Sequence, residues 1–132
     1  MSEIIVASDP FAVVVPYLRS VQGGVEVGVS VPPKTVDQYV WAHRFTTGTT
    51  DRVIDRSSIE FTVFGSDFAQ RLQLANLVRA HMLALEGTHN GIQVYGTVEI
   101  QGPLDLPDPI IDGQTITSLV IQVNTRNKVL NA

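Results

Sequence analysis

Apolar and polar residues alternate along three stretches in the first half of the chain, and a period of two predicts β-strands. Residues 25–31 read VEVGVSV, with four valines on one face. Residues 38–46, QYVWAHRFT, carry apolar side chains on both faces, and residues 58–64, SIEFTVF, carry them on one. Because β-branched and aromatic residues dominate these stretches, we predict three strands here.

The alternation returns in the second half of the chain. Residues 92–101, IQVYGTVEIQ, and residues 115–125, TITSLVIQVNT, each predict a strand with one apolar face. Residues 102–114, GPLDLPDPIIDGQ, contain three of the seven prolines, so we predict a loop between these strands. Residues 126–132 are predicted to form a loose, flexible tail.

Two other stretches have helical spacing. Residues 8–21, SDPFAVVVPYLRSV, begin with capping residues and a proline suited to a first turn, but Pro16 predicts a kinked or short helix. Residues 67–87 predict a long helix, from an Asp67 cap to a final glycine as the stop. Arg71 is expected on its solvent side. The apolar stripe of this helix is predicted to contain Phe68, Leu72, Ala75, Val78 or Leu77, Met82 and Leu85.

The predicted order is a helix, three strands, a long helix and two strands, with no internal repeat. Single helices among hairpin-like strands predict an α+β fold, with one mixed, largely antiparallel sheet of about five strands and two helices packed on one face. A length of 132 residues favours a single domain covering 1–132. We find neither a secretory signal at the N-terminus nor an apolar run long enough for a transmembrane helix.

Composition narrows the classes of function. The net charge is −4, and the nine basic residues are spread along the chain, so stable nucleic-acid binding is not expected. Charged residues make up only 17% of the chain, which indicates either burial by partner subunits or simple compactness. The absence of cysteine excludes disulfides, thiolate metal sites and a cysteine nucleophile.

No motif for catalysis is present. The three histidines lack metal-binding spacing, and His43 lies among aromatic residues on a strand, where packed or interface histidines are more common than ligands. The neighbouring aspartates fall in predicted loops, where such side chains usually bond their own backbone. No nucleophile-elbow or phosphate-binding pattern occurs. We therefore predict no catalytic residue, no cofactor and no metal site.

The stretch from 44 to 58, RFTTGTTDRVIDRSS, is unusual for a connection between two strands. It is longer than a hairpin turn needs, and it holds many charges of both signs. One interpretation is a contact with another subunit, where interleaved charges would set the register. The other is a solvated hairpin end with local charge neutralisation. Its charged residues are Arg44, Asp51, Arg52, Asp55 and Arg56.

Several short motifs occur in a familiar order. A predicted helix headed by DPF leads to a valine-rich strand ending in VSVPP, and an aromatic strand, YVWAHRF, runs into a Gly/Thr turn. DRVIDRSSIEFTVFG follows, then a helix with the rhythm A..LA..VRA. This series, mainly over residues 25–86, resembles the tail terminator (tail-completion) proteins of long-tailed siphophages, especially those of actinobacterial phages. The chain departs from that pattern at TTGTT, where relatives often have a glycine pair.

The resemblance implies a non-enzymatic virion protein. Copies would form a homo-hexameric ring on the head-proximal end of the tail tube, stop polymerisation of the tube protein and present a surface to the head-tail connector or stopper protein. A closed ring requires two different, complementary patches on each subunit. DNA would pass through the acidic lumen without specific binding. The expected location is the virion tail or neck, and the host cytoplasm during assembly, with no membrane partner.

With this resemblance, we interpret the charged stretch as a contact with a neighbouring subunit or the tube. Two alternatives within the virion are a neck or head-completion protein and a tail tube subunit. An alternative from another class is a small-molecule binding domain or an enzyme with a cleft between helix and sheet. The residues predicted at the subunit or tube interface are Arg44, Asp51, Arg52, Asp55, Arg56, Tyr39, Trp41 and His43.

Overall fold

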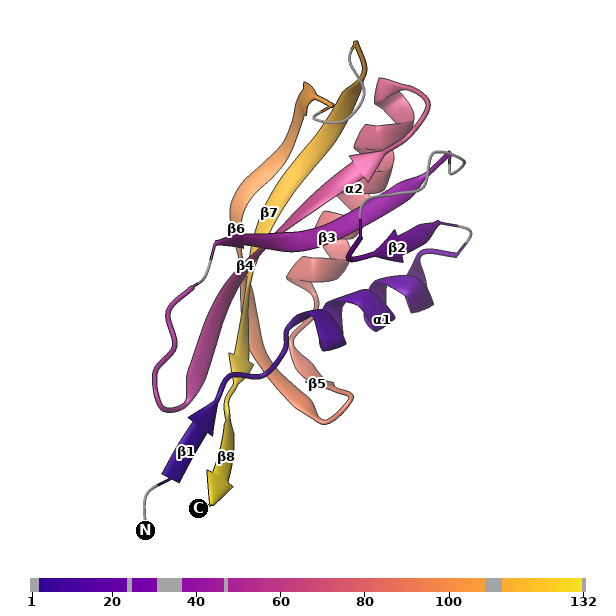
Figure 1. Cartoon of the computed structure of the whole chain (residues 1–132). Helices are drawn as coiled ribbons and strands as arrows, with labels where there is room; N and C mark the ends of the chain where they lie inside the picture. The colour runs from indigo at the N-terminus through magenta and orange to yellow at the C-terminus, as the bar shows by residue number, and fades with distance from the viewer. Residues whose placement is uncertain (1–2, 24, 31–36, 47, 109–112, 132) are drawn as a thin grey trace.

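A computed structural model describes residues 3–23, 25–30, 37–46, 48–108 and 113–131 (Figure 1). The described chain is an α+β fold with two helices and mostly strands, as predicted. In chain order the elements are β1 (Glu3–Val6), α1 (Phe11–Val21), β2 (Glu26–Gly28), β3 (Tyr39–Thr46), β4 (Ile54–Phe64), α2 (Phe68–Leu83), β5 (Gly87–His89), β6 (Ile92–Pro107), β7 (Thr115–Arg126) and β8 (Lys128–Asn131).

The strands form a curled six-stranded sheet in the order β2-β3-β4-β7-β6-β5 and a separate two-stranded sheet of β1 and β8. The pair β2–β3 is parallel, whereas the other neighbours in the large sheet are antiparallel. The predicted mixed, largely antiparallel sheet is therefore confirmed, with slightly more strands than the five expected. The strand predicted over 25–31 has only three residues, and position 31 lies outside the described residues.

Both helices lie on one face of the large sheet and close a single core with it (Figure 1). The alternation of β4 and β7 places every second side chain against the helices. The fully buried residues on this inner face are Ile59, Phe61 and Val63 of β4 and Leu119, Ile121 and Val123 of β7. The helices contribute Val13, Val14 and Leu18 from α1 and Leu74, Ala75, Val78 and Met82 from α2.

Asp67 caps α2 as predicted, because its Oδ1 accepts a hydrogen bond of 2.8 Å from the Gln70 N–H. The helix ends at Leu83 rather than at Gly87, the predicted stop. Gly87 has a φ of +134° and is instead the first residue of β5. The apolar stripe is only partly as predicted. Val78 and Met82 are buried, as are Ala75 and Leu85, but Phe68 and Leu77 are 52% and 45% exposed.

Arg71 is buried rather than on the solvent side of α2. Its Nη2 lies 3.3 Å from Asp105 Oδ1 and 2.7 Å from Thr115 Oγ1. Both partners belong to β6 and β7, at the end of the hairpin that these strands form. The prediction for Arg71 is wrong because a partner carboxylate replaces the water that a buried guanidinium would lose.

The loop predicted over 102–114 is wrong for residues 102–107, because β6 continues to Pro107, while residues 109–112 lie outside the described residues. The pairing of β6 with β7 shifts register between Gln101 and Leu104, so Gly102 and Pro103 fall in a bulge. The neighbouring strand β5 pairs only with the first residues of β6. The remainder of β6 is an edge strand, where proline removes no ladder hydrogen bond.

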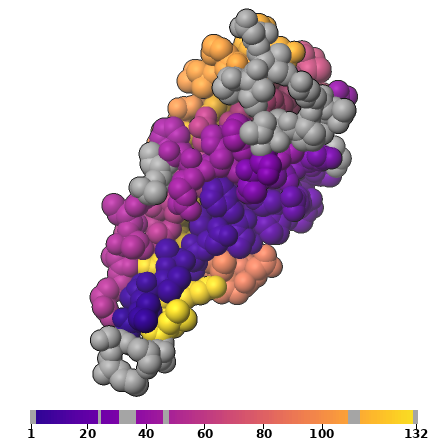
Figure 2. Space-filling model, viewed as in Figure 1, coloured from indigo at the N-terminus to yellow at the C-terminus, as the bar shows by residue number. Residues whose placement is uncertain are grey.

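The two chain ends meet beyond the large sheet. The segment predicted to be a loose tail, 126–132, instead contains β8, which pairs antiparallel with β1 through Ile4↔Leu130 and Ile5↔Val129. The Ser8 hydroxyl also donates to the Arg126 carbonyl at 2.6 Å. Figure 2 shows β1 in indigo and β8 in yellow at one end of an elongated molecule. Pairing with β1 therefore orders the end of the chain.

Candidate assembly surfaces

The connection between β3 and β4 is shorter than predicted, because β4 begins at Ile54 and includes Asp55 and Arg56. The loop doubles back onto this strand, and the Arg56 N–H donates to the Thr49 carbonyl at 2.9 Å. A Cβ atom at Gly48 would overlap the Arg56 carbonyl oxygen, so only glycine fits this approach. Gly48 and Thr49 of the Gly/Thr cluster therefore lie where the loop returns along β4, and Thr47 lies outside the described residues.

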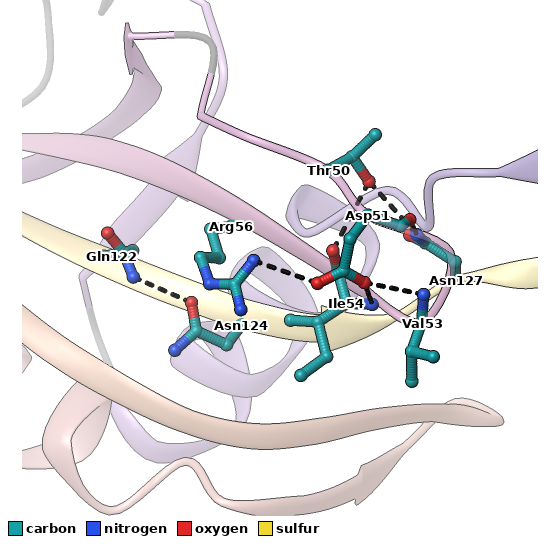
Figure 3. A network of polar contacts seen from close by, with 8 residues as sticks. All are labelled: Thr50, Asp51, Val53, Ile54, Arg56, Gln122, Asn124 and Asn127. Carbon is teal, nitrogen blue, oxygen red and sulfur yellow. Dashed lines mark hydrogen bonds and ion pairs between the residues drawn. The ribbon is translucent and has the colours of Figure 1, made fainter.

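Asp51 organises the turn itself (Figure 3). Its Oδ1 accepts hydrogen bonds of 2.7 Å from the N–H groups of both Val53 and Ile54, and its Oδ2 lies 3.4 Å from Arg56 Nη1. The backbone hydrogen bonds of Ile54 and Val53, with a smaller contribution from Arg56, hold the pKa of Asp51 below its ordinary value. The carboxylate therefore serves the local turn.

Asn127 anchors this loop to the far end of the chain. Its side-chain amide donates to Thr50 Oγ1 at 3.1 Å and to the Asp51 carbonyl at 2.7 Å, and its backbone N–H donates to the Val53 carbonyl at 2.8 Å (Figure 3). Asn127 lies between β7 and β8 and is buried. Internal bonds therefore hold the loop in one shape.

The three other charged side chains of the stretch lie in different environments. Arg52 points outward and pairs with Glu3 at 3.1 Å, in an exposed ion pair that contributes little stability. Arg44 turns toward α1, with its guanidinium carbon 5.7 Å from the centre of the Phe11 ring. Asp55 is buried and accepts a hydrogen bond of 2.6 Å from the Ser57 hydroxyl. Of the five charged candidates, Asp51, Arg52 and Arg56 therefore lie together at the hairpin end.

The three aromatic-face candidates lie on the face of the sheet away from the helices. Tyr39 donates its hydroxyl to the Ser30 carbonyl at 3.0 Å, and Trp41 donates its Nε1–H to the Val29 carbonyl at 3.1 Å. The Trp41 ring stacks on His43, with centroids 4.1 Å apart. Tyr39 and Trp41 thus hold the segment after β2 against β3.

A small polar cluster surrounds His43. Its Nε2 is hydrogen-bonded to Thr62 Oγ1 at 3.1 Å and lies 3.7 Å from Glu60 Oε1. The Ser118 hydroxyl donates to Glu60 Oε2 at 2.6 Å and is therefore held by a carboxylate rather than by the imidazole. Ser118 is only 1% exposed. A serine nucleophile needs a basic partner and access to substrate, so this arrangement does not favour nucleophilic catalysis.

The outward side of α2 is a surface that the residue-by-residue prediction missed. Both arginines of the helix form ion pairs with β6, Arg71 with Asp105 and Arg79 with Glu99. The outward side then presents apolar side chains, together with the uncharged polar side chains of Gln73 and Asn76, over about four turns. A shallow hollow of about 540 Å³ on this side is lined by Phe68, Ala69, Leu72, Gln73, Asn76 and Leu77. The signal in the sequence is the lack of any acidic residue between 68 and 83.

The β1–β8 ribbon is a second missed surface. Ile4 and Leu130 lie opposite each other in the pairing, and each is 51% exposed. Val6 and Val129 are exposed as well, so apolar side chains cover both sides of the ribbon. The signal was available as two short runs of strand-forming residues, EIIV near the start and KVLN near the end.

No group of three or more His, Cys, Asp or Glu side chains that could hold a metal ion occurs among the described residues. Within the same part of the chain, neither helix has the length and apolar character needed to cross a membrane. In comparisons with known proteins, the chain matches no protein-family model and no curated protein.

Proposed function

We propose that this chain is a structural virion protein of a long-tailed phage. In this role it is a ring-forming tail terminator, which caps the tail tube, stops tube polymerisation and forms the joint to the head connector. The observation that carries the proposal is the pair of exposed apolar surfaces, the outward side of α2 and the β1–β8 ribbon. The resemblance of the sequence to tail terminators indicates a ring in which neighbouring subunits would bury these surfaces.

Exposed apolar surfaces of this kind favour an assembly protein over a free monomer. A surface helix normally carries charged residues on its outer side, and a helix that is apolar on both sides is typical of a buried position. Here α2 packs Leu74 and Val78 against the sheet while Phe68 and Leu77 face outward. Burial by neighbouring subunits would remove these side chains from water.

The charges fit a protein through which DNA passes. The net charge is −4, and an acidic lumen built from several copies would repel DNA rather than retain it. The basic residues at the hairpin end, Arg52 and Arg56, have acidic partners within the chain. They remain candidates for contact with the tube or a neighbour, where an incoming charge would compete with these exposed pairs.

The alternative within the virion is a neck protein or a tail tube subunit. Tube subunits generally stack through a long loop, and the charged connection was the candidate for such a loop. Its described part, 48–53, is short and is tied down by Asn127. This geometry favours the terminator over the tube subunit. The remaining alternative is a small-molecule binding domain or an enzyme.

Electron microscopy of phage lysates tests the proposal directly. Cells infected by phage lacking this gene are expected to accumulate overlong, headless tails, and a plasmid copy of the gene should restore tails of normal length. Tails of normal length joined to heads in the absence of the protein would refute the terminator role. Headed particles without tails, or no tails at all, would instead favour the neck or tube alternative.

The contribution of the hairpin end needs a separate variant. Arg52→Gln with Arg56→Gln removes both positive charges without placing new acids beside Glu3 and Asp51. The double variant should fold but complement the deletion poorly, whereas the exposed control Asp37→Asn should complement fully. Full complementation by the arginine variant would remove the hairpin end from the interface.

A further inference from the structure

We propose that the outward side of α2 is the docking surface for the β1–β8 ribbon of a second copy of this chain. The inference deepens the proposed ring and rests on it, because it names the two different surfaces through which neighbouring copies would join. Each copy would present its ribbon to one neighbour and its α2 surface to the other.

The receiving surface is built from positions that recur along one side of α2. Phe68, Leu72 and Leu83 follow one line of the helix, Ala69 lies next to this line, and Leu77 lies at the far edge of the outward side. The charged groups of α2 are engaged elsewhere, since Arg71 and Arg79 bond carboxylates of β6. Arg79 lies beside this surface with its charge balanced by Glu99, and the rest of the surface is without charge. A shallow hollow lies near the first turns of the helix, and its lining includes Gln73 and Asn76. Such a surface selects an apolar partner.

The ribbon has the properties of such a partner. It consists of two short strands that pair only with each other, and an isolated two-stranded ribbon is at best marginally stable in water. The register places Ile4, Val6 and Leu130 on the same side. Figure 1 shows the ribbon extending past the large sheet, at the end where both termini lie. A covering surface from another molecule would stabilise it.

Charge complementarity identifies the second copy as the partner. Lys128 lies on the same side of the ribbon as Leu130, and Arg126 precedes it. Acidic residues stand beside both ends of the receiving surface, with Asp67 before α2 and Glu86 after it. Docking of the ribbon on α2 therefore brings opposite charges together. Glu3 of the ribbon is paired with Arg52, so Lys128 and Arg126 remain as its unbalanced charges. Joining two ribbons, or two α2 surfaces, would bring like charges together and is disfavoured.

The contact is consequently head-to-tail. The two surfaces differ in structure, so the contact is heterologous, and repeated copies either close into a ring or continue as a filament. A ring would bury both surfaces of every copy. This arrangement explains why one chain exposes two apolar surfaces in different places, which a single two-fold contact would not require.

The experiment uses two complementary variants of the full chain. The ribbon variant carries Ile4→Lys and Leu130→Glu, which places opposite charges at a directly paired position and so keeps the strands together. The helix variant carries Phe68→Gln and Leu77→Glu at two exposed positions. Thermal unfolding should show that both variants remain folded. The matched control is Val21→Glu, which changes an exposed apolar residue at the end of α1.

Sedimentation velocity then gives the masses. The wild-type chain and the Val21→Glu control should form the same closed oligomer, and each double variant alone should be monomeric. An equimolar mixture of the two variants should form dimers and nothing larger, because only the ribbon of the helix variant and the α2 surface of the ribbon variant remain intact. Two variants that are each monomeric alone can form a dimer together only through a head-to-tail contact between these two surfaces.

Three results would overturn the proposal: a wild-type chain that stays monomeric at its highest soluble concentration, a double variant that still forms the wild-type oligomer, or a mixture without dimers. These outcomes are distinct from failure of the terminator role, which is measured by tail length in the gene deletion. Overlong tails in the deletion together with a mixture that stays monomeric would retain the terminator and reject these surfaces.

Discussion

The side-chain amide of Asn90 donates a hydrogen bond of 3.2 Å to the backbone carbonyl of Ala12. In a regular helix this carbonyl would accept the N–H of residue 16, but Pro16 has no N–H. Asn90 lies in the turn between β5 and β6 with a φ of 51°, a conformation that asparagine tolerates well. The turn therefore supplies the donor that the proline lacks, and α1 continues through Pro16 to Val21.

Replacing Asn90 tests whether its side-chain amide compensates for the missing N–H of Pro16. Asn90→Gly keeps the positive φ but removes the amide, and we expect a loss of about 1 kcal/mol in the free energy of unfolding. In a Pro16→Ala background the helix regains its own N–H donor, so the same change should cost less. Urea unfolding of the four chains measures the difference. An equal loss in both backgrounds would show that the amide and the proline are not coupled.

A second prediction concerns the ion pair between Arg71 and Asp105, in which the arginine side chain is only 7% exposed. Asp105→Asn should lower the free energy of unfolding by about 2 kcal/mol, because it leaves a buried cation without its carboxylate; the partial exposure of Asp105 keeps the loss below that of a fully buried pair. Adding Arg71→Met removes the stranded charge and should recover part of the loss. If the double variant is less stable than Asp105→Asn alone, the guanidinium is stabilised by something other than this pair.

The burial of Arg71 also shows where prediction from sequence ends. The inner faces of β4 and β7 followed from a period of two, and the Asp67 cap followed from its place before an apolar periodic run. The partner of Arg71 lies in a proline-rich stretch that predicted a loop. A bulge and an unpaired edge allow strand structure there, and neither is visible in local composition.

The chain ends show the same limit at longer range. Pairing of Ile4 with Leu130 joins residues from opposite ends of the sequence, and no local pattern specifies which strands meet. Five residues of the candidate interface were predicted from their charge, and the structure directs several of those charges inward or onto their own loop. The uncharged side of α2 could have been predicted, because the residues at its outward positions include no acid over four turns.

A third prediction tests the anchor of the charged loop. Asn127→Ala removes both side-chain hydrogen bonds to Thr50 and Asp51 at a buried position, and we expect a loss of about 2 kcal/mol. Asn124→Ala is the matched control; it removes a partly exposed amide bonded to Gln122, and its effect should stay within about 0.5 kcal/mol. Hydrogen exchange should also quicken at the amides of Val53 and Ile54 in the Asn127 variant alone. Unchanged exchange there would mean that the turn holds without its anchor.

The last prediction concerns pH. Burial lowers the pKa of His43 below its ordinary value, and the nearby carboxylate of Glu60 opposes this shift in part. As the pH falls through the ordinary histidine range, the unfolded chain therefore binds a proton at this position before the folded chain does. The stability that depends on neutral His43 is complete above that range and is lost as the pH falls toward the folded-state pKa.

Replacing His43 with glutamine should remove this dependence. Between about pH 7.5 and pH 5.5, on either side of the ordinary histidine value, the wild-type chain should lose more stability than His43→Gln. Guanidinium unfolding followed by the fluorescence of Trp41, the only tryptophan, measures both chains. His81 and His89 are present in both and cancel in the comparison. Glu60→Gln should steepen the wild-type loss, because it removes the charge that favours protonated His43. Parallel curves for wild type and His43→Gln would show that His43 has the same pKa in the folded and unfolded chains.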